Sequence, residues 1–171
     1  MRRVIIATCI LIMVCLGLAN AAATPGVQQL LPKDNAVKGF KVMPGSLQYG
    51  KGEGLTNIYD GGYELYTKNG VIDAARRMYQ RKSDYVEVTV HTMKSDKAAM
   101  DFLKYWQKEN KVKSLTKSKG GASFIVTKPS VMAYGVKGKY FTTISAFYLP
   151  DKARQDVKAF LGVVEKNVVR K

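Results

Sequence analysis

Among the acidic residues of this chain, Asp60 and Glu64 have the spacing that most suggests a catalytic or cation-binding role. They are four residues apart, so in a helix they would share one face, where paired acids can bind a cation or act as general acid and base. The alternative is structural: Asp60 caps the helix start by accepting bonds from its free N–H groups, and Glu64 is solvated. Because aspartate is common at helix starts, capping is the preferred interpretation.

His91 is the only histidine of the chain, in a predicted strand where it shares a face with Glu87 and Thr89. A lone histidine on a strand is more often a surface or hydrogen-bonded residue than a ligand. With no second histidine and no cysteine after residue 15, the sequence predicts neither a zinc nor a haem site, and no cofactor. It also contains no Gly-x-Ser-x-Gly nucleophile elbow, no Gly-x-x-x-x-Gly-Lys phosphate loop and no EF-hand calcium loop.

The stretch from Ile58 to Gly70 combines a double glycine with three tyrosines at helical spacing. Tyr59, Tyr63 and Tyr66 stand at i, i+4 and i+7 and are predicted to line one face of a helix. The glycines weaken that helix by roughly 1 kcal/mol each relative to alanine. Close packing of a short helix on a sheet is the preferred explanation for them, and approach by a ligand is the alternative. The candidate ligand-binding residues are Tyr59, Asp60, Gly61, Gly62, Tyr63, Glu64, Tyr66 and His91.

Residues 1–21 have the organisation of a signal peptide. A basic start is followed by an apolar run over 4–18 and by the small residues Ala19 and Ala21, which predicts cleavage after Ala21. An uncleaved anchor is the minor alternative. Both cysteines lie in this leader, so the mature chain has no disulfide. The sequence therefore predicts an exported protein, periplasmic or extracellular, without a transmembrane helix after cleavage.

The chain is strongly basic, with 28 Lys plus Arg against 13 Asp plus Glu and a net charge of +15. Such an excess favours anionic partners, which outside the cytoplasm are envelope lipid, acidic polysaccharide or an acidic protein; nucleic acid is not expected. A general solubility role is the preferred alternative. The densest run predicts an anionic-surface patch on and after the middle helix, with a simple solvated helix face as the preferred alternative. Its candidate residues are Lys104, Lys108, Lys111 and Lys113.

Hydrophobic periodicity predicts one α+β domain over 38–171, preceded by a mobile N-terminal segment over 22–37. Period-two alternation and turn residues predict a mainly antiparallel sheet of about five strands. Apolar stripes predict amphipathic helices that pack on it. The expected strands are 71–81, 85–93, 123–127, 131–134 and 139–148, with a tentative short strand at 38–42. The expected helices are the tyrosine helix, one from Ser95 or Asp96 to about Glu109, and one from Pro150. Residues 43–54 and 111–121 are predicted to be loops.

The glycine-tyrosine stretch resembles a family of exported bacterial proteins known only as a domain of unknown function. Its members share an aromatic or leucine pair, an Asn or Asp, two glycines, an acid and a tyrosine, and then a Tyr-Gly or similar pair opening a strand. The matching residues are Ile58-Tyr59-Asp60-Gly61-Gly62, Glu64, Tyr66 and Gly70, with further similarity at Gly39-Phe40, His91-Thr92-Met93 and Gly138-Lys139-Tyr140-Phe141. The chain departs from the pattern at Ala98-Ala99-Met100 and at Asn69. The resemblance implies an exported single domain and supplies no catalytic residues.

Three functional hypotheses follow from the sequence. The first is a non-enzymatic binding or accessory protein of the periplasm or cell envelope, which uses the glycine-tyrosine helix and its basic face for recognition. The second is a hydrolase or lyase that uses Asp60 and Glu64, with His91 as an additional group. The third is a structural envelope protein whose tyrosines only pack. The binding protein is the preferred hypothesis, and an enzyme is the less favoured one.

Overall fold

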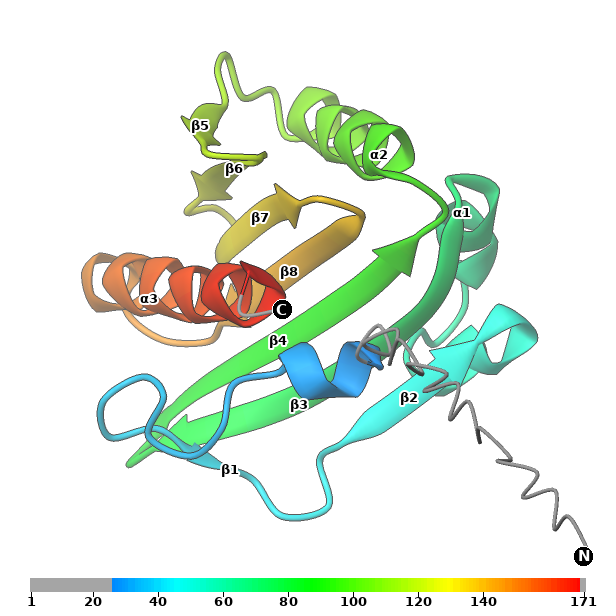
Figure 1. The fold of residues 1–171 in the computed structure, drawn as a ribbon. Coiled ribbons are helices and arrows are strands. Elements are labelled where there is room, and N and C mark those ends of the chain that lie inside the picture. Colours follow the sequence, from blue (N-terminus) through cyan, green and yellow to red (C-terminus); the bar gives the residue numbers. More distant parts are fainter. Residues whose placement is uncertain (1–25, 170–171) are drawn as a thin grey trace, which may run out of the picture.

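The computed structural model describes residues 26–169 and contains one mainly antiparallel sheet with helices packed on it (Figure 1), which confirms the α+β class. The sheet has eight strands in the order β1-β3-β4-β8-β7-β6-β5, and β2 pairs with β3 beside this path. The strands are β1 (Lys41–Val42), β2 (Gln48–Lys51), β3 (Val71–Arg81), β4 (Asp84–Met93), β5 (Thr116–Ser118), β6 (Gly121–Val126), β7 (Val131–Lys137) and β8 (Tyr140–Ala146). The helices are η1 (Val27–Leu30), η2 (Gly52–Asn57), α1 (Tyr63–Lys68), α2 (Asp96–Glu109) and α3 (Pro150–Val169).

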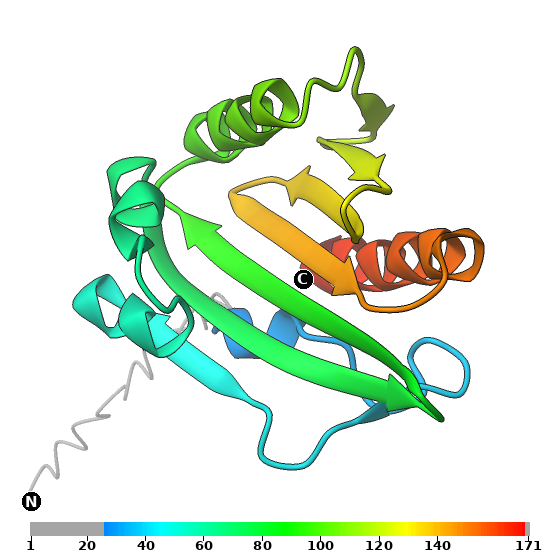
Figure 2. The same cartoon turned by 180° about the vertical axis from the view of Figure 1, so that it is seen from behind.

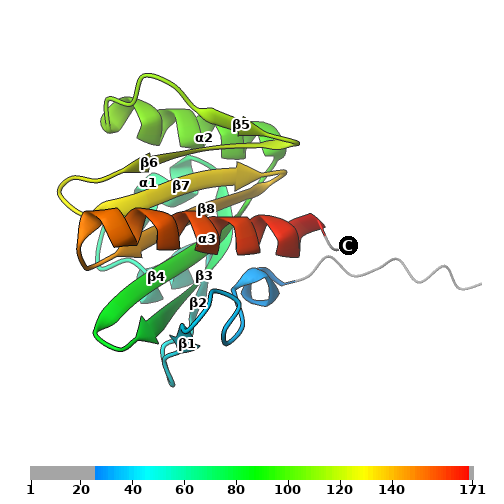
Figure 3. The same ribbon diagram turned by 90° about the vertical axis from the view of Figure 1, so that its left-hand side faces the viewer.

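Each face of the sheet carries its own hydrophobic core. On one face α3 and η1 cover a cluster that includes Val88, Ile144 and Phe160, and on the other α1, α2 and η2 cover a cluster that includes Phe102 and Phe141. Figure 3 looks onto the face of the sheet that α3 covers, with α3 in front of the strands and α1 and α2 behind them.

Strands β3 and β4 form a hairpin and are the two longest strands of the sheet, as Figure 2 shows from behind. In β4 the alternate valines Val86, Val88 and Val90 are fully buried, which is the alternation that predicted the strand. Arg81 pairs with Asp84, so the hairpin closes through Lys82 and Ser83 alone, and Lys82 takes a left-handed φ of 56°.

Helix α3 approaches the sheet closely because a glycine lies beneath it. A Cβ added at Gly135 of β7 would stand 2.6 Å from Cδ1 of Leu161. The predicted apolar stripe of α3 faces the sheet, with Ala153, Val157 and Phe160 fully buried. Helix α2 likewise begins where the sequence predicts, because the Ser95 hydroxyl accepts a hydrogen bond from the N–H of Ala98 at 3.1 Å.

The strand count and the domain boundary differ from the sequence-based prediction. Strands β2 and β5 lie in the segments 43–54 and 111–121, which were predicted to be loops. All three residues of β5 are exposed, and only Gly50 is buried in β2, so neither strand carries a hydrophobic alternation. The domain also begins before residue 38, because Val27 and Leu30 of η1 are buried in the core. The predicted signal peptide lies outside the described residues. Within residues 26–169, no helix has both the length and the apolar character needed to cross a membrane.

Candidate functional site

Three of the candidate residues, Tyr59, Tyr66 and His91, meet on the α1–α2 face of the sheet. The two tyrosine rings stack with centroids 3.8 Å apart, and the Tyr66 ring lies parallel to His91 at 5.5 Å. His91 projects from β4 and is fully buried. Tyr66 comes from α1, whereas Tyr59 lies in the turn between η2 and α1. Tyr63 packs on the same core but is not part of the stack.

The hydrogen bonds of His91 define its tautomer. Its Nδ1 lies 3.0 Å from the carbonyl oxygen of Phe141, which can only accept, so Nδ1 carries the proton. Burial lowers the pKa of His91 to about 4, so the ring is neutral near pH 7 and Nε2 is an acceptor. The hydroxyl of Tyr59 donates to Nε2. Burial also raises the pKa of Tyr59, which keeps this donor protonated. Both ring nitrogens are therefore engaged within the protein, and the imidazole anchors the segment after η2 to the sheet.

The double glycine forms a turn and not a helix, which corrects two expectations. Gly61 and Gly62 have left-handed φ angles of 81° and 74°, and α1 starts only at Tyr63. The predicted cap at Asp60 is wrong, because Gly62 is the N-cap and no side chain makes a capping bond. Close packing does not explain the glycines either, since nothing lies within 4 Å of a Cβ added at either one. Their positive φ explains them instead.

Replacing Gly62 by alanine is expected to lower the free energy of unfolding by about 1 kcal/mol, because an L side chain is strained in the left-handed region. Asparagine at the same position should cost less, because its side chain tolerates this conformation. Urea denaturation of both variants measures the difference. An alanine variant as stable as the parent would mean that the turn does not need a left-handed residue.

Asp60 and Glu64 are both exposed, and the predicted helical face that they would share does not exist. Asp60 lies in the turn before Gly61, and Glu64 lies in the first turn of α1. Neither carboxylate belongs to the group formed by Tyr59, Tyr66 and the buried His91.

The basic residues form an exposed surface at the end of α2 and on β5 and its turns. We call it the lysine surface, and it comprises Lys104, Lys108, Lys111, Lys113, Lys117 and Lys119. All six lysines are exposed, and none of them takes part in an ion pair within residues 26–169. Lys111 lies beyond the helix, because α2 ends at Glu109, and it has a left-handed φ of 54°. Between Asp101 and Asp151 the chain has nine lysines and a single acid, Glu109.

The aromatic residues next to these lysines are partly buried and pack against the core. Trp106 contacts Phe102 and Tyr134 with ring centroids 6.0 and 5.6 Å away, and Tyr105 stacks on Phe102 at 5.9 Å. The lysine surface is therefore a charged surface without an exposed aromatic anchor from α2.

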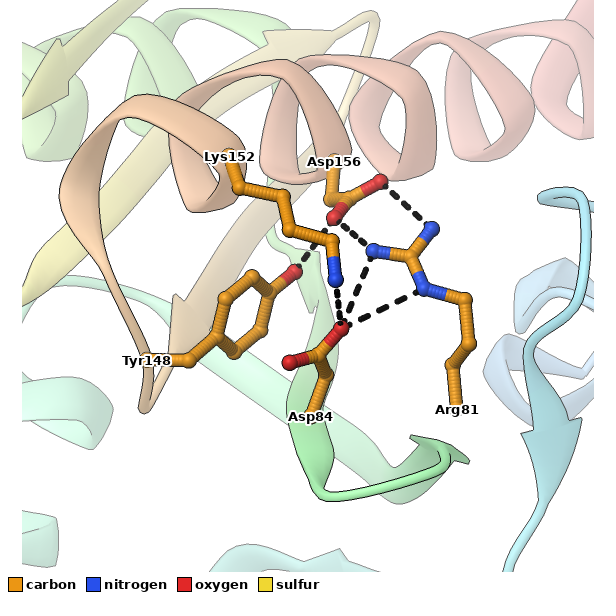
Figure 4. A network of polar contacts seen from close by, with 5 residues as sticks. All are labelled: Arg81, Asp84, Tyr148, Lys152 and Asp156. Carbon is orange, nitrogen blue, oxygen red and sulfur yellow. Dashed lines mark hydrogen bonds and ion pairs between the residues drawn. The ribbon is translucent and has the colours of Figure 1, made fainter.

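A polar network that the sequence did not reveal joins the β3–β4 turn to α3 (Figure 4). The guanidinium of Arg81 forms a two-pronged ion pair with Asp156, with Nη1 donating to Oδ1 at 3.1 Å. Its Nη2 also lies 3.3 Å from Oδ2 of Asp84, which accepts a further bond from Lys152. The Tyr148 hydroxyl donates to Asp156 at 2.7 Å. The bond from Lys152 lowers the pKa of Asp84, so this carboxylate is ionised near neutral pH.

The members of this network come from two distant stretches of the chain, and each charged member resembles a solvated surface charge when read alone. Arg81 and Asp156 are separated by 75 positions. Their side chains are nevertheless only 22% and 12% exposed. The one local signal is the pairing of Arg81 and Asp84 across a two-residue turn.

Comparison with known proteins gives one informative likeness. No protein-family model matches the sequence, and no curated protein matches it. Among solved structures, the chain is similar to the extracellular domain of PknH from Mycobacterium tuberculosis, with a TM-score of 0.50 and 14% sequence identity. The alignment covers 82% of this chain and 95% of that one. At this identity the likeness supports the fold alone, and the resemblance to the family of unknown function remains a prediction.

Proposed function

We propose that this protein is an exported, non-enzymatic binding domain of the cell envelope that contacts an anionic partner through the lysine surface. The observation that carries the proposal is the uneven distribution of charge. Between Asp101 and Asp151 the chain has nine lysines and one acid. The six lysines of the lysine surface are exposed and make no ion pair within the described residues. A cluster of like charges repels itself, and an anionic partner would relieve that repulsion. The predicted signal peptide supports an extracytoplasmic location.

The other candidate residues support enzymatic function less well. Catalysis by Asp60 and Glu64 needs carboxylates that converge on one site, and these two are exposed on either side of a glycine turn. His91 would have to release the Tyr59 hydroxyl before its Nε2 accepted a proton. The tyrosine stack serves to hold the η2–α1 segment on the sheet.

Removing three charges from the lysine surface is expected to weaken binding to phosphatidylglycerol vesicles by roughly a hundredfold. The change is Lys108→Gln, Lys111→Gln and Lys113→Gln in one protein, and each lysine near an anionic surface contributes about 1 kcal/mol. Co-sedimentation with vesicles measures the affinity. Raising the ionic strength should weaken binding of the parent protein, because exposed charges are screened.

The matched control removes the same number of charges elsewhere, by Lys33→Gln, Lys41→Gln and Lys51→Gln, which are also exposed. It should bind nearly as well as the parent. Equal losses in the two triple variants would show that net charge matters and the lysine surface does not. Binding to a soluble polyanion such as heparin, without binding to vesicles, would identify an acidic polymer instead of lipid as the partner.

A further inference from the structure

An open pocket of about 550 Å³ lies where three connections meet at one end of the sheet. The β3–β4 turn contributes Ser83 and Asp84, and the β6–β7 turn contributes Thr127 and Ser130. The link from β8 to α3 contributes Tyr148 and Leu149. Connections between strands are frequent positions for binding residues, because a rigid sheet holds them in place.

The pocket gathers polar groups that have hydrogen-bonding capacity to spare. The hydroxyls of Ser83, Thr127 and Ser130 make no hydrogen bond to any other residue within 26–169. Asp84 is only 9% exposed, and its Oδ2 takes all the bonds from Arg81 and Lys152. Its Oδ1 points away from both of these cations (Figure 4). Three hydroxyls and one carboxylate oxygen are thus available to a ligand.

The four charges of the polar network beside the pocket cancel one another. Arg81 and Lys152 supply two positive charges, and Asp84 and Asp156 supply two negative ones, all within one bonded network. Of these four groups only Asp84 lines the pocket, and its charge is already paired with Arg81 and Lys152. The network therefore leaves no unpaired charge for a charged ligand, which fits an uncharged one.

Apolar groups complete the lining. The Tyr148 ring is held in place because its hydroxyl donates to Asp156. Leu149 is 80% exposed, the highest value among the large hydrophobic side chains of the described residues, and it lies at this pocket. A lining that combines apolar side chains with a few polar groups is typical of ligand sites.

We infer that this pocket binds a neutral sugar unit. A sugar ring presents C–H groups that pack on aromatic and aliphatic side chains, and hydroxyls that exchange hydrogen bonds with serine, threonine and carboxylate oxygens. The pocket supplies each of these partners, and its volume is ample for one ring. This site is independent of the lysine surface, so each proposal can fail without the other.

The test is an NMR titration of the isotopically labelled exported protein with glucose, galactose, arabinose and N-acetylglucosamine. At least one of these sugars should give saturable shifts centred on the amides of Ser83, Ser130 and Leu149. The variant Ser83→Ala with Ser130→Ala should bind that sugar about tenfold more weakly, because two hydrogen bonds are lost. Neither hydroxyl has a hydrogen-bond partner within residues 26–169, so the variant should fold normally.

The matched control replaces Ser114 and Ser118, two exposed serines away from the pocket, by alanine and should leave the affinity unchanged. Absence of saturable shifts with all four sugars would overturn the inference. So would shifts that Ser83→Ala with Ser130→Ala leaves intact. If glucuronic acid or glucosamine bound more tightly than the neutral sugars, the inference of an uncharged ligand would be wrong.

Discussion

Replacing Asp156 by asparagine is expected to lower the free energy of unfolding by about 3 kcal/mol. The change removes the charge that pairs with Arg81, whose guanidinium is also held over the Phe40 ring at 4.2 Å. Breaking a buried ion pair from one side leaves an uncompensated charge in a poorly solvated position. The expected loss is at the lower end for such pairs, because 22% of the Arg81 side chain remains in water and Asp84 still neutralises part of its charge. Urea denaturation near pH 7 measures it.

Asp101 provides the control, because it is also a helical aspartate in an ion pair. Its partner Lys97 is 86% exposed and Asp101 is 52% exposed, so Asp101→Asn should leave the stability unchanged within error. Arg81→Lys should fall between the parent and Asp156→Asn, because lysine keeps the charge but cannot make the two-pronged pair. If Asp156→Asn were as stable as the parent, the network would not hold α3 to the β3–β4 turn.

The parts of the fold that the sequence predicted well are those with strong local patterns. Strand β4 alternates valines with polar residues, and α2 combines a serine cap with an apolar stripe that ends in Trp106. These patterns are local because one buried face repeats with the period of the element. Strands β2 and β5 were missed because they are held by backbone pairing with β3 and β6, and pairing of this kind does not require any particular side chain.

The geometry of the candidate residues could not be predicted from the sequence, and their binding of a ligand stays a prediction. Of the eight candidates, the structure brings Tyr59, Tyr66 and His91 into contact. The helical spacing that suggested the group was misleading, because Tyr59 precedes the helix and the left-handed Gly61 and Gly62 intervene. A glycine pair within a helical spacing indicates two different structures, a weak helix or a turn, and periodicity alone does not separate them. The turn is what places the Tyr59 hydroxyl against His91.

Acidification provides a second test with a large effect. Lowering the pH from about 7 to about 4.5 is expected to cost ~2 kcal/mol of unfolding free energy through His91 alone. Burial lowers the pKa of His91 to about 4 in the folded protein, whereas an unfolded histidine titrates near 6.5. Between these values the unfolded chain binds a proton that the folded protein does not, so stability is complete above about pH 6.5 and falls as the pH decreases towards 4. Because His91 is the only histidine of the chain, no other imidazole contributes to the slope in this window.

Comparison with His91→Gln isolates this contribution, because glutamine does not titrate. The variant should be less stable near pH 7, since it loses the imidazole stack, but its stability should change less on acidification. Glu87 acts in the opposite direction, because burial raises its pKa despite the ion pair with Arg76 at 3.6 Å. Its protonation therefore favours the folded state as the pH falls. The variant Glu87→Gln measures this contribution to the pH dependence. The measured pH range ends at about 4.5. At lower pH, Asp84 also begins to lose its stabilising contribution, because its ion pairs lower its pKa in the folded protein. Equal pH slopes in the parent and His91→Gln would mean that the imidazole is not held neutral by burial between Tyr59 and Phe141.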